Sequence, residues 1–163
     1  MNTDMQFSEV LLTLGLILYA LVISILAQNS PDDYLLAHNA ARAAIGADPL
    51  EWDEDVAAYA EGYAARRSLD CKLEHSSGPY GENIAVGPPE LSGVTAVKLW
   101  VDERSSYNYF LNSCLWGQCL HYTQVVWKKS ERLGCARVEC PNGYAFVTCN
   151  YDPPGNYVGE RPY

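Results

Sequence analysis

Apolar side chains recur at helical spacing in three stretches of the chain. In the first, Ser30, Pro31 and two aspartates stand before the apolar positions. A capping serine, a proline at the first helical position and acids near the positive end of the helix dipole predict a helix start here. We expect this helix to end at about Gly46, because glycine suits the left-handed conformation that closes a helix. Two more helices are predicted over residues 53–69 and 90–107.

The pattern changes period in the second half of the chain. Segments rich in β-branched and aromatic residues and separated by turn signals are predicted to be strands: residues 123–127, 133–138 and 144–151. Pro141-Asn142-Gly143 predicts a hairpin turn between the last two strands. Loops are predicted at residues 76–81 and 87–89, and an extended, irregular tail over residues 152–163. Helices followed by strands indicate an α+β domain.

The chain opens on a long uncharged segment. Residues 10–27 contain no charged side chain, and a small residue, Ala27, stands directly before a polar stretch. This predicts a signal peptide over residues 1–27 that is cleaved after Ala27. An uncleaved membrane anchor is the alternative, because about 18 apolar residues can also span a bilayer. The flank after Ala27 has no basic cluster, which favours cleavage, a single domain over residues 28–163 and an extracellular destination, with apoplast and vacuole left open.

Cysteine content and charge narrow the class of protein. All six cysteines follow the predicted cleavage point, which indicates three disulfides with 15 pairings open, formed in an oxidising compartment. Their spacing lacks paired CxxC motifs, so we do not expect cysteine-bound zinc. The chain has a net charge of −9, and loss of Asp4 and Glu9 with the leader leaves −7. This sign argues against a nucleic-acid partner.

Several motifs then resemble one family. Residues 119–130 (CLHYTQVVWKKS) and 146–157 (FVTCNYDPPGNY) are similar to two signatures of the CAP superfamily, which groups cysteine-rich secretory proteins, antigen 5 and pathogenesis-related class 1 proteins. His38-Asn39 and Gly81-Glu82-Asn83 match two shorter motifs, and Arg161-Pro162-Tyr163 resembles the plant branch. The resemblance implies a three-layer α-β-α sandwich with a central, mainly antiparallel sheet. It also implies three disulfides: Cys71–Cys140, Cys114–Cys119 and Cys135–Cys149.

The resemblance also implies a polar site. Four residues match positions that line the family's central cleft: His75, Glu82, Glu103 and His121. Two imidazoles with two carboxylates can bind a divalent metal such as Zn²⁺, the carboxylates orienting water or the rings. The alternatives are a hydrogen-bonded network that holds loops on the sheet, and a metal-dependent hydrolase. We predict no enzyme, because no nucleophile is evident beyond Ser76 and Ser77, and an even cysteine count leaves no free thiol. His38 is predicted to hydrogen-bond within the core.

Two segments suggest partners. The aromatic run Tyr107-Asn108-Tyr109-Phe110 either packs inward or lines a groove for a lipid, and the residues of such a groove are unknown from the sequence. Because family members are associated with sterol or fatty-acid binding, we expect a monomeric plant defence protein that acts on fungi or oomycetes by binding a sterol or other lipid of the pathogen membrane. The tail resembles a pattern from which a defence-signalling peptide is released. Cleavage between Asp152 and Pro153 would free residues 153–163 for a receptor, the alternative being a tail that stays packed on the domain.

Overall fold

The computed structural model describes residues 9, 11–16 and 28–163. The signal peptide predicted over residues 1–27 and its cleavage point therefore fall largely outside the described residues. Among the helices that are described, none combines the length and the apolar character needed to cross a bilayer.

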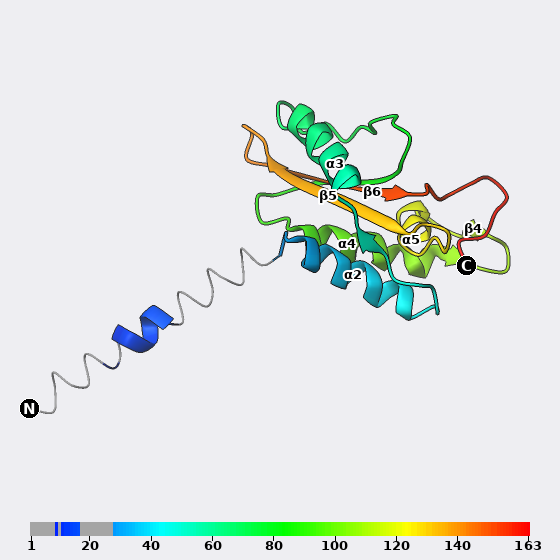
Figure 1. The fold of residues 1–163 in the computed structure, drawn as a ribbon, viewed down its shortest axis with the longest axis horizontal. Helices are drawn as coiled ribbons and strands as arrows, with labels where there is room; N and C mark the ends of the chain where they lie inside the picture. Colours follow the sequence, from blue (N-terminus) through cyan, green and yellow to red (C-terminus); the bar gives the residue numbers. More distant parts are fainter. Residues whose placement is uncertain (1–8, 10, 17–27) are drawn as a thin grey trace, which may run out of the picture.

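Residues 28–163 form a sheet covered by helices on both faces (Figure 1). The helices are α2 (Pro31–Ala43), α3 (Glu54–Arg67), α4 (Gly93–Asp102), the 3₁₀ helix η1 (Glu103–Ser106) and α5 (Leu120–Val125). The strands are β1 (Glu51–Trp52), β2 (Gly81–Gly87), β3 (Tyr107–Asn108), β4 (Ser113–Cys114), β5 (Arg132–Glu139) and β6 (Ala145–Asp152). The predicted α+β, three-layer α-β-α sandwich is confirmed.

The main sheet has the order β1-β5-β6-β2. The pairs β5·β6 and β6·β2 are antiparallel, and only the short edge strand β1 pairs in parallel, with β5. Helix α3 covers one face, while α2, α4 and α5 cover the other (Figure 1). Two buried apolar clusters result, a larger one under α2, α4 and α5 and a smaller one under α3. Gly134 lets α3 approach β5, because a Cβ there would lie 2.1 Å from the backbone N of Ala57.

The helix signals in the sequence act as predicted. Ser30 and Asp33 form a reciprocal capping box at the start of α2, and the side chain of Asp53 accepts hydrogen bonds from the first turn of α3. The third predicted helix begins later than expected, behind the cap Ser92, and ends at Asp102 before η1. The predicted hairpin turn at residues 141–143 joins β5 to β6.

One predicted strand was wrong, and one observed strand was not predicted. Residues 123–127, predicted as a strand, lie in and directly after α5, where every side chain from Tyr122 to Trp127 is buried. A short, continuously buried apolar run does not distinguish helix from strand, and here the helix prevails. Residues 81–87 form β2, although their glycines, with Asn83 between them, resemble loop sequence. This strand pairs over its whole length with β6 and is held by tertiary contacts.

Three disulfides join the layers within residues 28–163: Cys71–Cys140, Cys114–Cys119 and Cys135–Cys149. They are the pairs that the family resemblance implies. The first ties the loop after α3 to the end of β5, and the third joins directly opposed positions of β5 and β6. The Cys114–Cys119 bond closes the loop between β4 and α5. Each such bond contributes roughly 2–4 kcal/mol of stability.

Candidate functional site

A cavity of about 450 Å³ opens between the start of β2, the N-terminus of α5 and the loop closed by the Cys114–Cys119 disulfide. Three of the four predicted site residues line it: His75, Glu82 and His121. The remainder of its wall is largely apolar or amide in character, and includes Leu73, Ile84, Leu120 and Gln118. The fourth predicted residue, Glu103, lies behind His121 on η1.

His75 and Glu82 form the first of two imidazole–carboxylate pairs. The Nδ1 of His75 lies 2.7 Å from Oε1 of Glu82, and the same oxygen accepts a hydrogen bond from the backbone N of Ser76. Asn150 of β6 donates to the second oxygen of Glu82 at 3.3 Å. The Glu82 side chain is only 6% exposed, whereas that of His75 is 57% exposed. A nearly buried carboxylate on β2 thus orients a histidine at the mouth of the cavity.

His121 and Glu103 form the second pair. The Nδ1 of His121 lies 2.7 Å from Oε1 of Glu103, whose other oxygen accepts from the backbone N atoms of His121 and Tyr122. Glu103 therefore caps the first turn of α5, which has no side-chain cap from its own N-cap residue, Cys119. The ring of His121 stacks on Trp100, with 6.3 Å between ring centroids. The hydrogen bond to Glu103, the cap and the stacking on Trp100 together fix the orientation of this imidazole.

The two pairs partly fit a metal site. Each histidine uses Nδ1 for its carboxylate, and neither Nε2 makes a hydrogen bond to the described residues. A carboxylate behind a histidine orients the ring and raises its basicity as a ligand. Within residues 28–163, however, no group of three or more His, Cys, Asp or Glu side chains is placed to hold a metal ion. Zn²⁺ would bind through His75 and His121 alone, and its other ligands would come from solvent or a bound molecule.

Behind the cavity lies a buried polar network, of which the sequence predicted only the hydrogen bonding of His38. Asn83 of β2 donates to the backbone carbonyl of His121 at 3.0 Å and to the hydroxyl of Tyr151 at 3.1 Å. The Tyr151 hydroxyl in turn donates to Nε2 of His38, whose Nδ1 donates to the carbonyl of Tyr34. The predicted core role of His38 is thus observed. The Asn in Gly81-Glu82-Asn83 was the one available signal for this network, since the other partners are distant in sequence.

The aromatic run Tyr107-Asn108-Tyr109-Phe110 packs inward only in part, and its last residue is exposed to solvent. Tyr107 is half-buried, and Tyr109 stacks on Tyr163 with 5.1 Å between ring centroids. Phe110, at the tip of the β3–β4 hairpin, is 87% exposed. The exposed apolar side chains continue into the disulfide loop and the first residue of α5. We call them the apolar edge: Tyr109, Phe110, Leu111, Leu115, Trp116 and Leu120.

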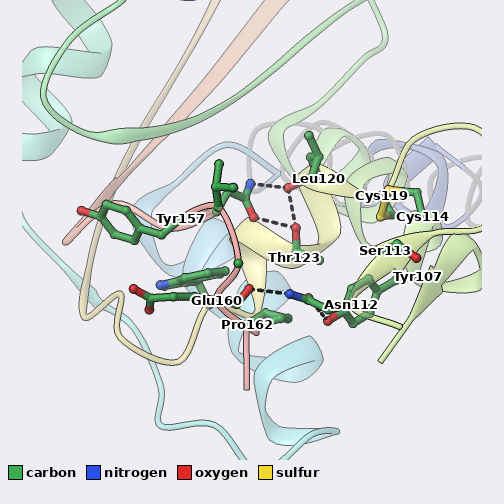
Figure 2. A pocket seen from close by; sticks show the side chains of 14 residues that line it. Tyr107, Asn112, Ser113, Cys114, Cys119, Leu120, Thr123, Tyr157, Glu160 and Pro162 are labelled. Atoms are coloured by element: carbon green, nitrogen blue, oxygen red, sulfur yellow. Dashed lines mark hydrogen bonds between the residues drawn. A yellow bond between two sulfur atoms is a disulfide. The ribbon is translucent and has the colours of Figure 1, made fainter. Parts of the chain in front are cut away.

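Two further hollows adjoin these elements. A shallow trough of about 400 Å³ runs between α2 and α4, and valines of α4 and alanines of α2 form most of its wall. Lys98 and Arg104 lie at this trough. A smaller hollow of about 250 Å³ lies between the C-terminal tail, α5 and the β3–β4 hairpin. Figure 2 shows this hollow, with Leu120 and Thr123 of α5 on one side and Glu160 and Pro162 of the tail on another.

The tail packs on the domain at both of its ends. Asp152 still belongs to β6: its carbonyl accepts from the backbone N of Glu131, and its carboxylate is paired with Arg132. The carbonyl of Pro153 accepts from Ser130 at 2.7 Å. At the far end, the carbonyl of Pro162 accepts from the backbone N of Lys128. Between these ends, Gly155 and Asn156 are hydrogen-bonded to α5, whereas residues 157–159 make no hydrogen bond to the described residues outside the tail and Val158 is fully exposed.

The three-layer sandwich, the three disulfides and the two histidine–carboxylate pairs are the features by which the family of this chain can be identified. Comparison with known protein families names that family. A family model described as the cysteine-rich secretory protein family, CAP, matches residues 35–151. The chain therefore belongs to the CAP family.

Plant proteins are among its similar relatives. "Pathogenesis-related protein 1" of Arabidopsis thaliana is 55% identical over 157 residues, which cover 96% of this chain and 97% of the relative. "Basic form of pathogenesis-related protein 1" of Nicotiana tabacum is 59% identical over 137 residues, 84% of this chain and 77% of the relative. The resemblance to the pathogenesis-related class 1 branch is thereby confirmed.

Solved structures confirm the fold. The venom allergen-like protein 4 of Schistosoma mansoni is 28% identical, with a TM-score of 0.64 over 82% of this chain and 92% of that one. NaASP2, solved with Zn²⁺, has a TM-score of 0.67 over 84% of this chain and 87% of that one. At 22% identity, this second likeness concerns the fold alone.

Proposed function

We propose that this protein is an extracellular plant defence protein that acts by binding a sterol or another lipid of a pathogen membrane. Its relatives in Arabidopsis and tobacco are named pathogenesis-related proteins, which supports the defence role. The family is described as secretory, and three disulfides suit an oxidising compartment. Apoplast is the destination that fits these features.

The observation that carries the lipid proposal is the apolar edge. Its six side chains come from residues 109–120, and Phe110 and Trp116 are 87% and 60% exposed. An isolated exposed leucine is ordinary, but a run of large apolar and aromatic side chains on one hairpin and the adjoining loop marks an interaction surface. Aromatic side chains suit the flat, rigid ring system of a sterol, and Trp and Tyr favour the boundary between water and hydrocarbon.

The charge of the protein indicates how this binding would work. With a net charge of −9 over the whole chain, electrostatic attraction to an anionic membrane is not available. Attraction must come from burial of apolar surface, at about 25 cal/mol per Å². Vesicle binding should therefore be nearly insensitive to salt. The trough between α2 and α4, with its valine and alanine wall, offers a second apolar surface that suits an acyl chain.

The experiment compares three forms of the purified protein on phosphatidylcholine vesicles with and without ergosterol. Phe110→Ser removes the most exposed aromatic of the apolar edge, while Leu36→Ser changes an exposed leucine of α2 as the matched control. Wild type and Leu36→Ser should bind sterol vesicles saturably, and Phe110→Ser about tenfold more weakly. Binding equal for all three, or none by wild type with or without Zn²⁺, contradicts the proposal.

We also infer that the two histidine pairs serve binding rather than turnover. Tyr59 donates to the hydroxyl of Ser76, the serine beside His75, and all six cysteines are in disulfides. Residues 28–163 therefore offer no free thiol, and the Ser76 hydroxyl is hydrogen-bonded to Tyr59 rather than to an imidazole. A metal-dependent hydrolase is the rival function. Glu103→Gln distinguishes the two: a lipid binder keeps its sterol binding, whereas a hydrolase loses turnover of ester or peptide substrates.

Release of residues 153–163 as a signal for a receptor is a further proposal, which rests on the likeness of the tail to the family pattern. Deletion of the tail should then abolish signalling in plant tissue. If leaf defence responses to the purified protein are unchanged without the tail, this role is excluded.

A further inference from the structure

The last four residues of the chain hold the β3–β4 hairpin. The guanidinium of Arg161 donates from Nε to the carbonyl of Tyr109 and from Nη2 to the carbonyl of Phe110, each at 3.2 Å. The same guanidinium lies 5.5 Å from the centroid of the Tyr109 ring. Asn112 donates to the carbonyl of Glu160 at 2.9 Å. A side chain of the tail thus donates to backbone carbonyls of the hairpin, and a side chain of the hairpin donates to a backbone carbonyl of the tail. About fifty residues separate the two segments in the chain.

The hairpin has little support of its own. Its strands pair only through Tyr107 with Cys114 and Asn108 with Ser113. A two-stranded hairpin is marginally stable alone in water, and Phe110 and Leu111 at its tip project into solvent. Three local hydrogen bonds shape the tip: from the backbone N of Leu111 to the Asn108 side chain, from the backbone N of Asn112 to the carbonyl of Tyr109, and from the Tyr107 hydroxyl to the Asn112 side chain. Its orientation therefore depends on contacts from elsewhere.

The tail is itself anchored firmly enough to give that support. Pro162 is buried, and its carbonyl accepts from the backbone N of Lys128 at 2.7 Å. The ring of Tyr163 stacks on Tyr109, and its hydroxyl lies 3.4 Å from that of Tyr122, a fully buried residue of α5. The tail thus connects the hairpin tip to the rigid body of the domain.

We propose that residues 160–163 are a clamp that presents the apolar edge to lipid, with Arg161 as a positioning residue. The inference rests on the proposed lipid function, and it adds a regulatory consequence. Cleavage in the exposed span 157–159 separates residues 160–163 from the rest of the chain, so that only non-covalent contacts hold them. Proteolysis of the tail would then loosen the hairpin and weaken lipid binding. Release of the tail peptide would therefore lower the affinity of the remaining domain for lipid.

The test measures hairpin order and lipid binding separately. Arg161→Gln removes the paired donors, Arg161→Lys keeps the charge and one donor, and a variant that ends at Gly159 lacks the clamp. Lys129→Ala is the matched control, because it breaks an exposed ion pair with Glu160 and no contact to the hairpin. Hydrogen exchange of residues 107–115 reports hairpin order, and ergosterol vesicles report binding.

We expect exchange in residues 107–115 to rise about tenfold in Arg161→Gln and in the shortened variant, with a smaller rise in Arg161→Lys and none in Lys129→Ala. Vesicle affinity should fall about fivefold to tenfold in the same order, since a disordered contact surface must be ordered on binding. Unchanged exchange in the shortened variant overturns the clamp. A loosened hairpin with unchanged vesicle affinity overturns the positioning role. If wild type binds no vesicles, the lipid function itself fails, and the exchange data alone then decide whether the clamp exists.

Discussion

Acid should destabilise this fold through His38. Burial lowers the pKa of His38 to about 4, the hydrogen bond to the carbonyl of Tyr34 opposes this shift, and the charge of Arg42 adds to it. In the unfolded chain the same imidazole takes up a proton near its ordinary pKa of about 6.5. Between these two values the unfolded state binds more protons than the folded state, so the free energy of unfolding falls as the pH falls.

The magnitude follows from the difference between the two pKa values. A lowering of about 2.5 pH units corresponds to about 3 kcal/mol, since each unit is worth about 1.4 kcal/mol. This contribution is fully present above pH 6.5. It is lost on acidification, by about 2 kcal/mol at pH 5 and about 3 kcal/mol at pH 4.

Urea denaturation at pH 7, 5 and 4 tests this for wild type, His38→Gln and the surface control Leu36→Ser. A glutamine does not titrate, and its amide can keep a hydrogen bond to Tyr151. Comparison with this variant removes the acid sensitivity that carboxylates contribute to both proteins. The advantage of wild type over His38→Gln should shrink by about 2 kcal/mol between pH 7 and 5. Parallel pH profiles for the two proteins would refute the reasoning, and Leu36→Ser should follow wild type throughout.

Three other predictions concern stability, proteolysis and metal. Arg42→Met should lower the free energy of unfolding by about 3–5 kcal/mol in urea, because a buried guanidinium that donates to four backbone carbonyls is lost; a loss below about 1 kcal/mol contradicts this. In native protein, a broad-specificity protease should cut within residues 157–159 before it cuts after Asp152, whose carbonyl is paired, and mass spectrometry of early fragments that begin after Asp152 would show otherwise. Calorimetric titration with Zn²⁺ should show affinity reduced about tenfold or more by His75→Ala or His121→Ala, and unchanged affinity excludes a two-histidine site.

The sequence was most informative where structure is decided locally. The start of α2 could be predicted from Ser30 and Pro31, and that of α3 from Asp53, because a cap acts within one turn of its own helix. The position of β2 could not be predicted from the sequence, because residues 81–87 form a strand through their pairing with β6. The buried run at residues 123–127 failed for the related reason that tertiary packing, rather than spacing, selects helix there.

The identity of the candidate site residues could be predicted from the sequence, whereas their mutual arrangement could not. The resemblance supplied the four polar residues, but the pairing of His121 with Glu103 depends on the packing of η1 against α5. Nor does the sequence tell an inward aromatic from an exposed one: Tyr109 packs on the tail, while its neighbour Phe110 projects into solvent. The partner that distinguishes them, Tyr163, lies far from both in sequence, in the C-terminal tail.

The location of the bound lipid is the most direct test of the proposal that the apolar edge binds the membrane. Trp116 is 60% exposed on the apolar edge, whereas Trp100 and Trp127 are buried in the core. Vesicles that contain ergosterol and brominated phosphatidylcholine quench tryptophan emission only where the indole enters the lipid. We expect quenching in wild type that Trp116→Phe abolishes and Phe110→Ser reduces. Quenching that persists in Trp116→Phe, or its absence in wild type on sterol vesicles, would contradict it.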